Sequence, residues 1–298
     1  MIKQPAYLKK GDKIAIVCPA KKLPKPIDYG ISILQGWGLE VVIGQSVTAS
    51  HHQFAGTDQL RAQDLQQFLD DTSIKAIIAA RGGYGTIRII DELDFTLFKA
   101  NPKWIIGFSD ITVLLSHLYA DLKTQSIHGQ MPYTFEESTP EALESLRKAL
   151  FGEIDVYNYS NEFPNKEGNI SGELIGGNLT LLLAVEGSVS EMDYKNKILF
   201  IEDVGEHEYA IDRMMRTLKR KGKLKDLKAL IVGAFNELGE EGIAFGQSPE
   251  EVIWELVKEY DYPVCFNFPS GHINDNRAMV LGKMINLSIE KNKVTFKY

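Results

Sequence analysis

Cysteine is scarce in this sequence, and the two that occur, Cys18 and Cys265, lie in the apolar segments IAIVCPA and YPVCFNF. A thiol in such surroundings usually packs as a small buried hydrophobe. Two isolated cysteines exclude a disulfide framework, so a reducing compartment such as the cytoplasm fits this chain better. The first apolar run is short and is interrupted by Asp12 and Lys13, so no secretory signal is expected.

Long hydrophobic runs, excess positive charge and metal-binding motifs are also missing. No stretch of about eighteen apolar residues occurs, which excludes a bilayer-spanning segment, and we expect no membrane partner. The formal net charge is −7 and the lysines and arginines are scattered, so nucleic acid is not an expected partner. There is no HExxH motif, no paired CxxC and no histidine cluster with ligand spacing, and we expect no metal.

The chain does contain a regular alternation of apolar runs and amphipathic segments in its first half. The runs KIAIVCPA, LEVVIGQ, IKAIIAA and KWIIGFSD are separated by predicted helices near residues 26–37, 57–70 and 86–93. This pattern is typical of βαβ units around a buried parallel sheet. It predicts an α/β fold with an open parallel-sheet domain over residues 1–152.

The texture changes after that domain. Residues 153–168 are polar and rich in Asn, Gly and Glu, which is typical of a linker. Shorter apolar runs and two helical patterns follow. They predict a smaller C-terminal domain of mixed α/β type over residues 169–298.

The sharpest local feature is Gly107-Phe108-Ser109-Asp110, where the apolar run WIIGF gives way to the helical pattern ITVLLSHLYADL. A serine on a tight strand-to-helix turn is held above the sheet, and the following amide points at a developing oxyanion. This is the pattern of a nucleophile elbow, although Ile111 replaces the last glycine of G-x-S-x-G. A helix cap by Ser109 or Asp110 is the simpler alternative.

A nucleophilic serine needs a base and an acid that orients the base. Of six histidines, His272 in the loop SGHINDN and His128 in SIHGQMPY follow apolar runs, and His272 is the stronger candidate. Glu202 follows the run KILFI and suits the orienting role, with Asp203 as its competitor. The order Ser, Glu, His is that of α/β-hydrolases.

A glycine-rich turn, Arg81-Gly82-Gly83-Tyr84-Gly85, follows the run IKAIIAA. Its backbone amides could cradle a phosphate or supply a second oxyanion donor, for which Gly83 is the candidate beside the amide of Asp110. Arg81, with Tyr84 beside it, is the candidate in this turn for contact with the substrate. A buried ion pair with a local acid is an equally good explanation of Arg81.

Taken together, these motifs resemble the LD-carboxypeptidase family of serine peptidases, which includes the microcin C immunity peptidases. The matching segments run almost end to end: LKKGDKIAIVCPA, ARGGYG, GFSD with the following Ile-Thr, His128-Gly129, GGNLTLL, FIEDVGE followed by YAIDRM, and SGH. Two departures occur. Gln130 stands where the family usually has proline, and MVLG at 279–282 replaces a segment that commonly contains Leu-Pro.

The resemblance implies a catalytic Ser109, Glu202 and His272 at a domain interface, no cofactor, and a homodimer. It implies cleavage of the L,D amide bond before the terminal D-alanine of murein tetrapeptides, in cytoplasmic cell-wall recycling, so the partner is a small peptide or muropeptide. An immunity-type peptidase acting on an acylated aminoacyl-nucleotide or another small amide is the first alternative. A non-catalytic module that binds a nucleotide or sugar phosphate through the glycine-rich turn is the second.

Overall fold

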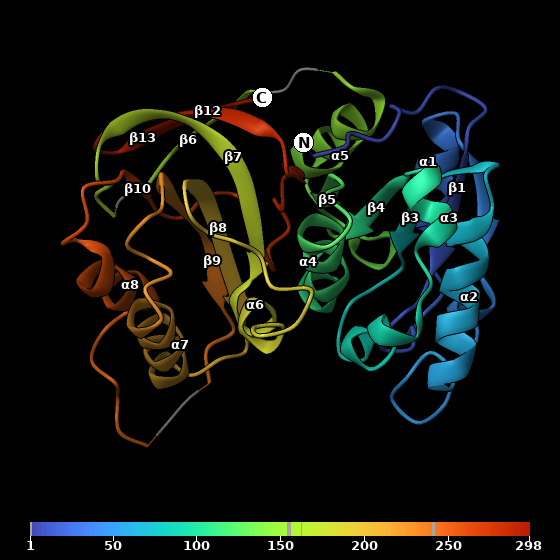
Figure 1. Ribbon diagram of the computed structural model, residues 1–298, viewed down its shortest axis with the longest axis horizontal. Coiled ribbons are helices and arrows are strands. Elements are labelled where there is room, and N and C mark those ends of the chain that lie inside the picture. The colour runs from blue at the N-terminus through green and yellow to red at the C-terminus, as the bar shows by residue number, and fades with distance from the viewer. Residues whose placement is uncertain (1, 154–155, 162, 240–241) are drawn as a thin grey trace.

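The computed structural model describes residues 2–153, 156–161, 163–239 and 242–298, which form two β-sheets with helices packed against them. Figure 1 shows the N-terminal half on the right, the C-terminal half on the left, and helix α4 (Thr112–Ala120) between the two sheets. None of the helices in these residues is both long and apolar enough to cross a membrane.

The first sheet has the strand order β11-β5-β4-β3-β1-β2. Five parallel strands come from the N-terminal half: β1 (Lys13–Val17), β2 (Glu40–Ile43), β3 (Ile74–Ala79), β4 (Trp104–Gly107) and β5 (Ser126–His128). Most of their residues are buried, as helices on both faces of a parallel sheet require. The expected open parallel-sheet domain is confirmed. Its antiparallel edge strand β11 (Met279–Leu281), however, comes from the C-terminal half.

The helices of this half are α1 (Asp28–Gly36), α2 (Asp58–Asp70), α3 (Thr96–Ala100), α4 and α5 (Pro140–Phe151). α2 begins where the Thr57 side chain accepts a hydrogen bond from the amide of Leu60. The helix predicted near 86–93 is wrong. Two 3₁₀ turns, η2 (Thr86–Arg88) and η3 (Ile90–Glu92), stand there, because four β-branched residues in an eight-residue stretch disfavour an α-helix.

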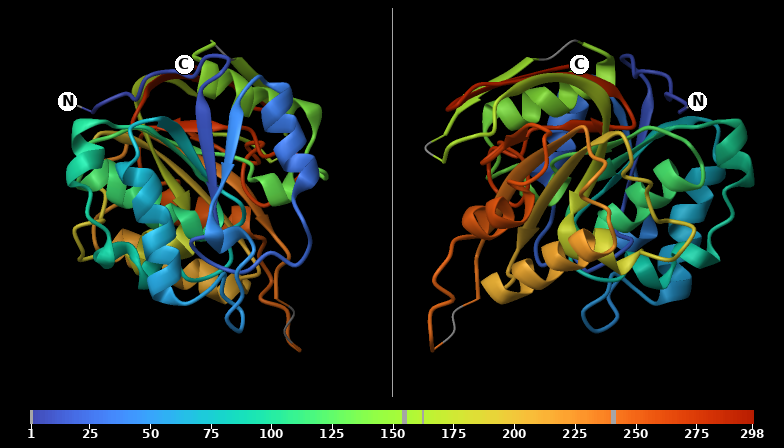
Figure 2. Two further views of the ribbon diagram at one scale, coloured as in Figure 1. Left: turned by 90° about the vertical axis from the view of Figure 1, so that its right-hand side faces the viewer. Right: turned by 60° about the vertical axis from the view of Figure 1, so that its left-hand side comes forward.

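The second sheet is mixed and has the order β10-β9-β8-β7-β12-β13-β6. Its parallel part contains β7 (Gly168–Asn178), β8 (Lys197–Val204), β9 (Ala229–Asn236) and β10 (Val264–Cys265), and its antiparallel part β12 (Met284–Ile289), β13 (Lys293–Lys297) and β6 (Val156–Ser160). Helices α7 (Glu208–Arg220) and α8 (Pro249–Val257) lie together on one side of this sheet (Figure 2), and α6 (Leu179–Ala184) follows β7. The expected mixed α/β architecture is confirmed.

Part of the expected linker belongs to this sheet, since β6 pairs with β13. Residues 154–155 and 162 of that segment lie outside the described residues. The division into residues 1–152, 153–168 and 169–298 stays a prediction.

The two halves meet where β7 ends against the start of α4. Gly177 has φ +146°, and a Cβ atom there would lie 2.8 Å from Cγ2 of Thr112. The next amide, of Asn178, donates to Thr112 Oγ1 at 3.2 Å. Only glycine permits this backbone and this approach, so the second sheet packs directly on the helix that follows β4.

Candidate active site

Ser109 lies immediately beyond β4, at the carboxyl edge of the first sheet. Its φ of 63° is in the left-handed region, which non-glycine residues rarely adopt. A single 3₁₀ turn, η4 (Ser109–Ile111), leads into α4. Ser109 is partly exposed, whereas its neighbours Phe108 and Asp110 are buried. A strained serine between a strand and a helix is the arrangement expected of a nucleophile elbow.

The glycine-rich turn after β3 packs against this elbow. A Cβ atom at Gly82 would lie 2.8 Å from Ser109 Cβ and 3.4 Å from the amide nitrogen of Asp110. The Asp110 carboxylate accepts the amide of Thr86 at 2.8 Å and so ties the turn to the elbow. Burial raises the pKa of Asp110, although the Thr86 hydrogen bonds oppose this. The buried Arg61 donates to the carbonyl oxygen of Gly85 at 3.0 Å from the other side.

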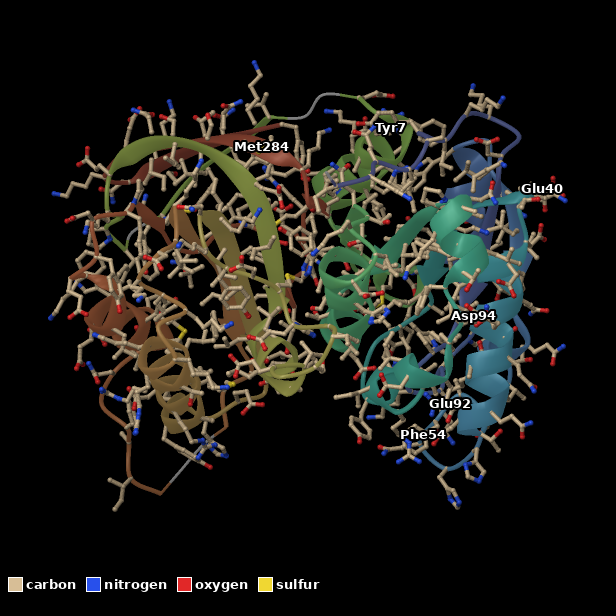
Figure 3. The ribbon with its side chains drawn as sticks, viewed as in Figure 1. Tyr7, Glu40, Phe54, Glu92, Asp94 and Met284 are labelled. Atoms are coloured by element: carbon tan, nitrogen blue, oxygen red, sulfur yellow. The ribbon has the colours of Figure 1, made fainter. Side chains whose placement is uncertain are left out.

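Arg81 and Tyr84 lie on the exposed side of the turn. The Arg81 guanidinium donates to the carbonyl of Lys22 at 2.9 Å and stacks 4.9 Å from the Tyr133 ring centroid. Among the described residues it forms no ion pair with a carboxylate. Tyr84 is 47% exposed and packs 6.1 Å from the ring of Phe54, which Figure 3 labels at the lower end of the N-terminal half.

Glu202 and His272 form a hydrogen-bonded pair in the second half. Glu202 is fully buried near the end of β8, and His272 follows β10 with its side chain 18% exposed. His272 Nδ1 lies 2.7 Å from Glu202 Oε2. Burial lowers the pKa of His272, but the charge and hydrogen bond of Glu202 outweigh it, and the pKa is raised. The carboxylate therefore stabilises an imidazolium and holds the ring with Nε2 free.

The structure brings the elbow and this pair to one place. The ring of Phe108, the residue before Ser109, lies 4.9 Å from the His272 ring. Among the described residues no hydrogen bond joins Ser109 Oγ to His272, as is common without substrate. Beside them is a hollow of about 210 Å³, which is lined by Phe108, Gln130, Thr134, Glu137, Glu237, His272, Ile273 and Asn274.

The competing acid, Asp203, has other partners. Its oxygens accept hydrogen bonds from Asn178 Nδ2 and from the amide and hydroxyl of Thr180, each at 2.9 Å. Burial, with help from the charge of Glu202, raises the pKa of Asp203 to about 6. Asp203 thus fastens the end of β8 to the start of α6.

The competing base, His128, is completely buried and does not contact solvent. Neither of its ring nitrogens has a hydrogen-bond partner among the described residues. Burial lowers its pKa to about 4. The ring therefore stays neutral at physiological pH.

Two asparagines that sequence reasoning missed shape the loop of His272. Asn236 Nδ2 donates to the carbonyl of His272 at 2.7 Å, and Asn276 Oδ1 accepts the amide of Gly271 at 2.9 Å. Asn236 could have been identified from the sequence because it ends the buried strand β9. A position at the end of an apolar run also identified Glu202.

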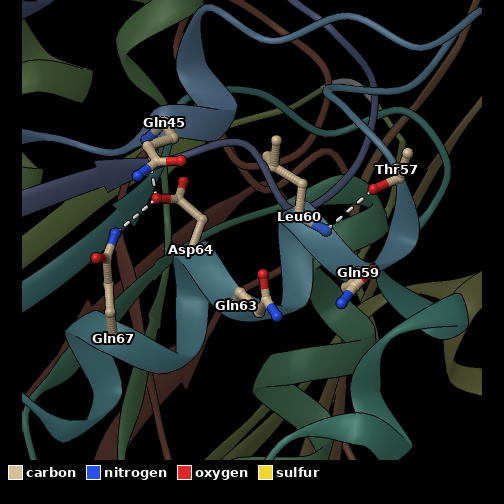
Figure 4. A pocket seen from close by; sticks show the side chains of 7 residues that line it. All are labelled: Gln45, Thr57, Gln59, Leu60, Gln63, Asp64 and Gln67. Carbon is tan, nitrogen blue, oxygen red and sulfur yellow. Dashed lines mark hydrogen bonds between the residues drawn. The ribbon is translucent and has the colours of Figure 1, made fainter.

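Another hollow lies on α2, lined by Gln45, Thr57, Gln59, Leu60, Gln63, Asp64 and Gln67 (Figure 4). Its carboxylate, Asp64, accepts the amide of Gln45 and the side chain of Gln67, both at 2.8 Å. These contacts hold the turn after β2. Within the described ranges, no group of three or more His, Cys, Asp or Glu is placed to hold a metal ion.

Comparison with known proteins gives consistent matches. Family models described as the LD-carboxypeptidase N-terminal and C-terminal domains match residues 14–129 and 171–287. A probable murein peptide carboxypeptidase of Bacillus subtilis is 34% identical over 94% of this chain and 89% of its own length. A murein tetrapeptide carboxypeptidase of Pseudomonas aeruginosa is 30% identical over 91% of each chain.

Solved structures agree with this picture. A muramoyltetrapeptide carboxypeptidase from Oxalobacter formigenes superposes with a TM-score of 0.86 at 28% identity, over 96% of this chain and 98% of the other. The microcin C7 self-immunity protein has the same fold, with a TM-score of 0.87 at 24% identity over 99% of this chain and 98% of the other.

Proposed function

This chain belongs to the LD-carboxypeptidase family, and we propose that it removes the terminal D-alanine from murein tetrapeptides by cleaving the L,D amide bond before it. The observation that carries this proposal is the His272–Glu202 pair, 2.7 Å apart, beside a serine held at φ 63°. A base next to a strained, partly exposed serine supports acyl transfer through a covalent intermediate.

In this mechanism His272 Nε2 accepts the proton of Ser109 Oγ as the oxygen attacks the amide carbonyl. Glu202 stabilises the imidazolium, and the ring then gives the proton to the departing D-alanine nitrogen. Water enters next, and His272 activates it to hydrolyse the acyl-enzyme.

The amides of Asp110 and Gly83 are the proposed oxyanion donors. The contact between the glycine-rich turn and the elbow supports this assignment, because it places two backbone segments around Ser109. Arg81 is the proposed partner of the substrate carboxylate, with Tyr84 at the exposed side of the turn. Its guanidinium keeps donors free after its hydrogen bond to Lys22.

We place this reaction in cytoplasmic turnover of cell-wall peptides. The free, buried thiols of Cys18 and Cys265 suit a reducing compartment. The homodimer stays a prediction.

The test is mass spectrometry after incubation with L-Ala-D-Glu-diaminopimelate-D-Ala. Wild-type protein should release D-alanine, and Ser109→Ala should lose several orders of magnitude in rate. Ser116→Ala, which changes a buried serine of α4, is the matched control and should keep its activity.

Wild-type activity on an acylated aminoacyl-nucleotide, without D-alanine release, would replace this substrate by the immunity-type one. The mechanism would be excluded if a serine-reactive probe failed to label the wild type and the Ser109→Ala variant still bound a sugar phosphate.

A further inference from the structure

His128 lies directly behind the proposed catalytic residues. It ends β5, where the register pairs it with Gly107 of β4 on one side and with Met279 of β11 on the other. Its ring lies 5.8 Å from Phe108 and edge-on to Phe200 at 5.0 Å. Phe200 precedes Glu202 by two residues on β8, so His128 reaches from the first sheet to the strand that carries Glu202.

Glu202 and Asn276 both act on the His128 ring, and all three side chains have buried polar atoms without partners among the described residues. These atoms are His128 Nδ1 and Nε2, Glu202 Oε1 and Asn276 Nδ2. The other polar atoms of the two neighbours are used, since Glu202 Oε2 binds His272 and Asn276 Oδ1 accepts from Ser270 and Gly271. Unpaired buried polar groups are rare and destabilising, so a group of them indicates partners for one another.

These atoms are complementary. Asn276 Nδ2 can only donate and the Glu202 carboxylate oxygen can only accept, whereas a neutral imidazole has one donor and one acceptor. Burial keeps His128 neutral, because it lowers the pKa to about 4 although the charge of Glu202 opposes this. His272 is the other titratable group that acts on the ring, and the aromatic rings of Phe108 and Phe200 pack against it.

We propose that His128 is a positioning residue, which accepts a hydrogen bond from Asn276 Nδ2 and donates one to Glu202 Oε1, directly or through one buried water. This contact fixes the second oxygen of the carboxylate. Oε2 then stays aimed at His272 Nδ1. The catalytic consequence rests on the proposed function, whereas the hydrogen bond itself does not.

The kinetic test compares His128→Phe, which keeps an aromatic ring of similar size, with His128→Gln, which keeps a donor and an acceptor. His128→Phe should lower kcat by roughly 10- to 100-fold with KM within about twofold, as loss of a supporting hydrogen bond does elsewhere. The acidic limb of its kcat/KM profile should move to higher pH, because a carboxylate that loses a donor binds the imidazolium more strongly. His128→Gln should recover much of both.

His117→Phe is the matched control. His117 is also buried and packs 4.8 Å from an aromatic ring, but its partner is Ser190 Oγ at 3.0 Å, away from Glu202. It should leave kcat and the pH profile unchanged. A folded His128→Phe protein with wild-type kcat and a wild-type pH profile would overturn the assignment.

A second measurement needs neither substrate nor a substitution at 128. In ¹⁵N-histidine-labelled wild type, NMR should show His128 as one neutral tautomer from pH 5 to 8, with an N–H protected from exchange. Its resonances should shift in Glu202→Gln and stay in place in Ser109→Ala. A ring that titrates in this range, or ignores Glu202→Gln, refutes the assignment. If wild type releases no D-alanine, the proposed function fails and this spectrum still decides the role of His128.

Discussion

The two sides of the site are built by different means. On the nucleophile side the backbone does the shaping, through the left-handed Ser109 and the close approach of Gly82. On the base side buried side chains do it, since Glu202 is fully buried and holds His272 through one hydrogen bond of 2.7 Å.

This difference decides which changes each side tolerates. A backbone-shaped region fails when an added atom has no space, whereas a region shaped by buried polar groups fails when one partner is removed. The first kind of change should displace the serine. Removal of a buried partner should change the pKa and the orientation of His272.

The largest expected effect belongs to the base side. Glu202→Gln should lower kcat/KM by roughly 10²- to 10⁴-fold at neutral pH, since it removes the charge that stabilises the imidazolium and sets the tautomer. In the proposed mechanism the reaction needs neutral His272, so the wild type should lose activity as pH falls through the raised pKa. Without the charge of Glu202 the main influence that opposes burial is gone, and the acidic limb should move to lower pH. Rate profiles from pH 4 to 9 measure both.

Asp203→Asn is the control for this variant, because it neutralises the adjacent buried acid. It places an amide group against the donors of Asn178 and Thr180 and should destabilise the fold by about 1–3 kcal/mol. Its acidic limb should move much less than that of Glu202→Gln. If the two variants moved the acidic limb equally, the net charge near His272, rather than its hydrogen bond to Glu202, would determine the pKa of His272.

The next effect tests the nucleophile side. Gly82→Ala would place Cβ 2.8 Å from Ser109 Cβ and 3.1 Å from its Oγ, so the elbow must shift. Small displacements of a reacting group cost roughly 10- to 100-fold in kcat, and overpacking costs about 1–3 kcal/mol of stability. Steady-state kinetics and thermal melts check both.

Gly36→Ala is its counterpart. Gly36 ends α1, is exposed, and has nothing within 4 Å of an added Cβ. It should leave kcat unchanged and stabilise the protein by about 0.5–1 kcal/mol. A Gly82→Ala enzyme with normal kcat would show that the turn does not shape the elbow.

A third prediction separates binding from chemistry. Arg81→Ala should raise KM roughly 10- to 100-fold with little change in kcat, because a charge-assisted hydrogen bond to the substrate carboxylate is lost. Arg147 pairs with Glu144 and Glu153, and Arg147→Ala should change neither KM nor kcat.

A substrate that ends in D-alanine amide sharpens this test. Wild type should bind it as weakly as Arg81→Ala binds the free acid, and Arg81→Ala should show no further loss. If the amide substrate and the Arg81→Ala substitution weakened binding additively, Arg81 would not be the partner of the substrate carboxylate.

The sequence predicted the two sides to different extents. Ser109, Glu202 and the glycine-rich turn each follow a contiguous run of apolar residues, and such a run marks the end of a buried strand in the sequence. The sequence did not predict β11, because a run of three apolar residues is too short to show the pattern of a strand. Its pairing with β5 also joins residues about 150 positions apart. The contacts around His128 were hidden for the same reason, because they depend on how the two halves pack.

The smallest effect concerns a charge at the rim of the base side. Glu237 is exposed, lines the hollow beside His272, and adds slightly to the rise of the His272 pKa. Exposed pairs are worth about 0.2–1 kcal/mol, so Glu237→Gln should move the acidic limb to lower pH by roughly 0.2–0.5 units, without loss of kcat. Salt should abolish this shift and leave that of Glu202→Gln in place, because water and ions screen only the exposed charge. A shift that survives 1 M salt would mean that Glu237 acts on His272 from a closed site, as Glu202 does.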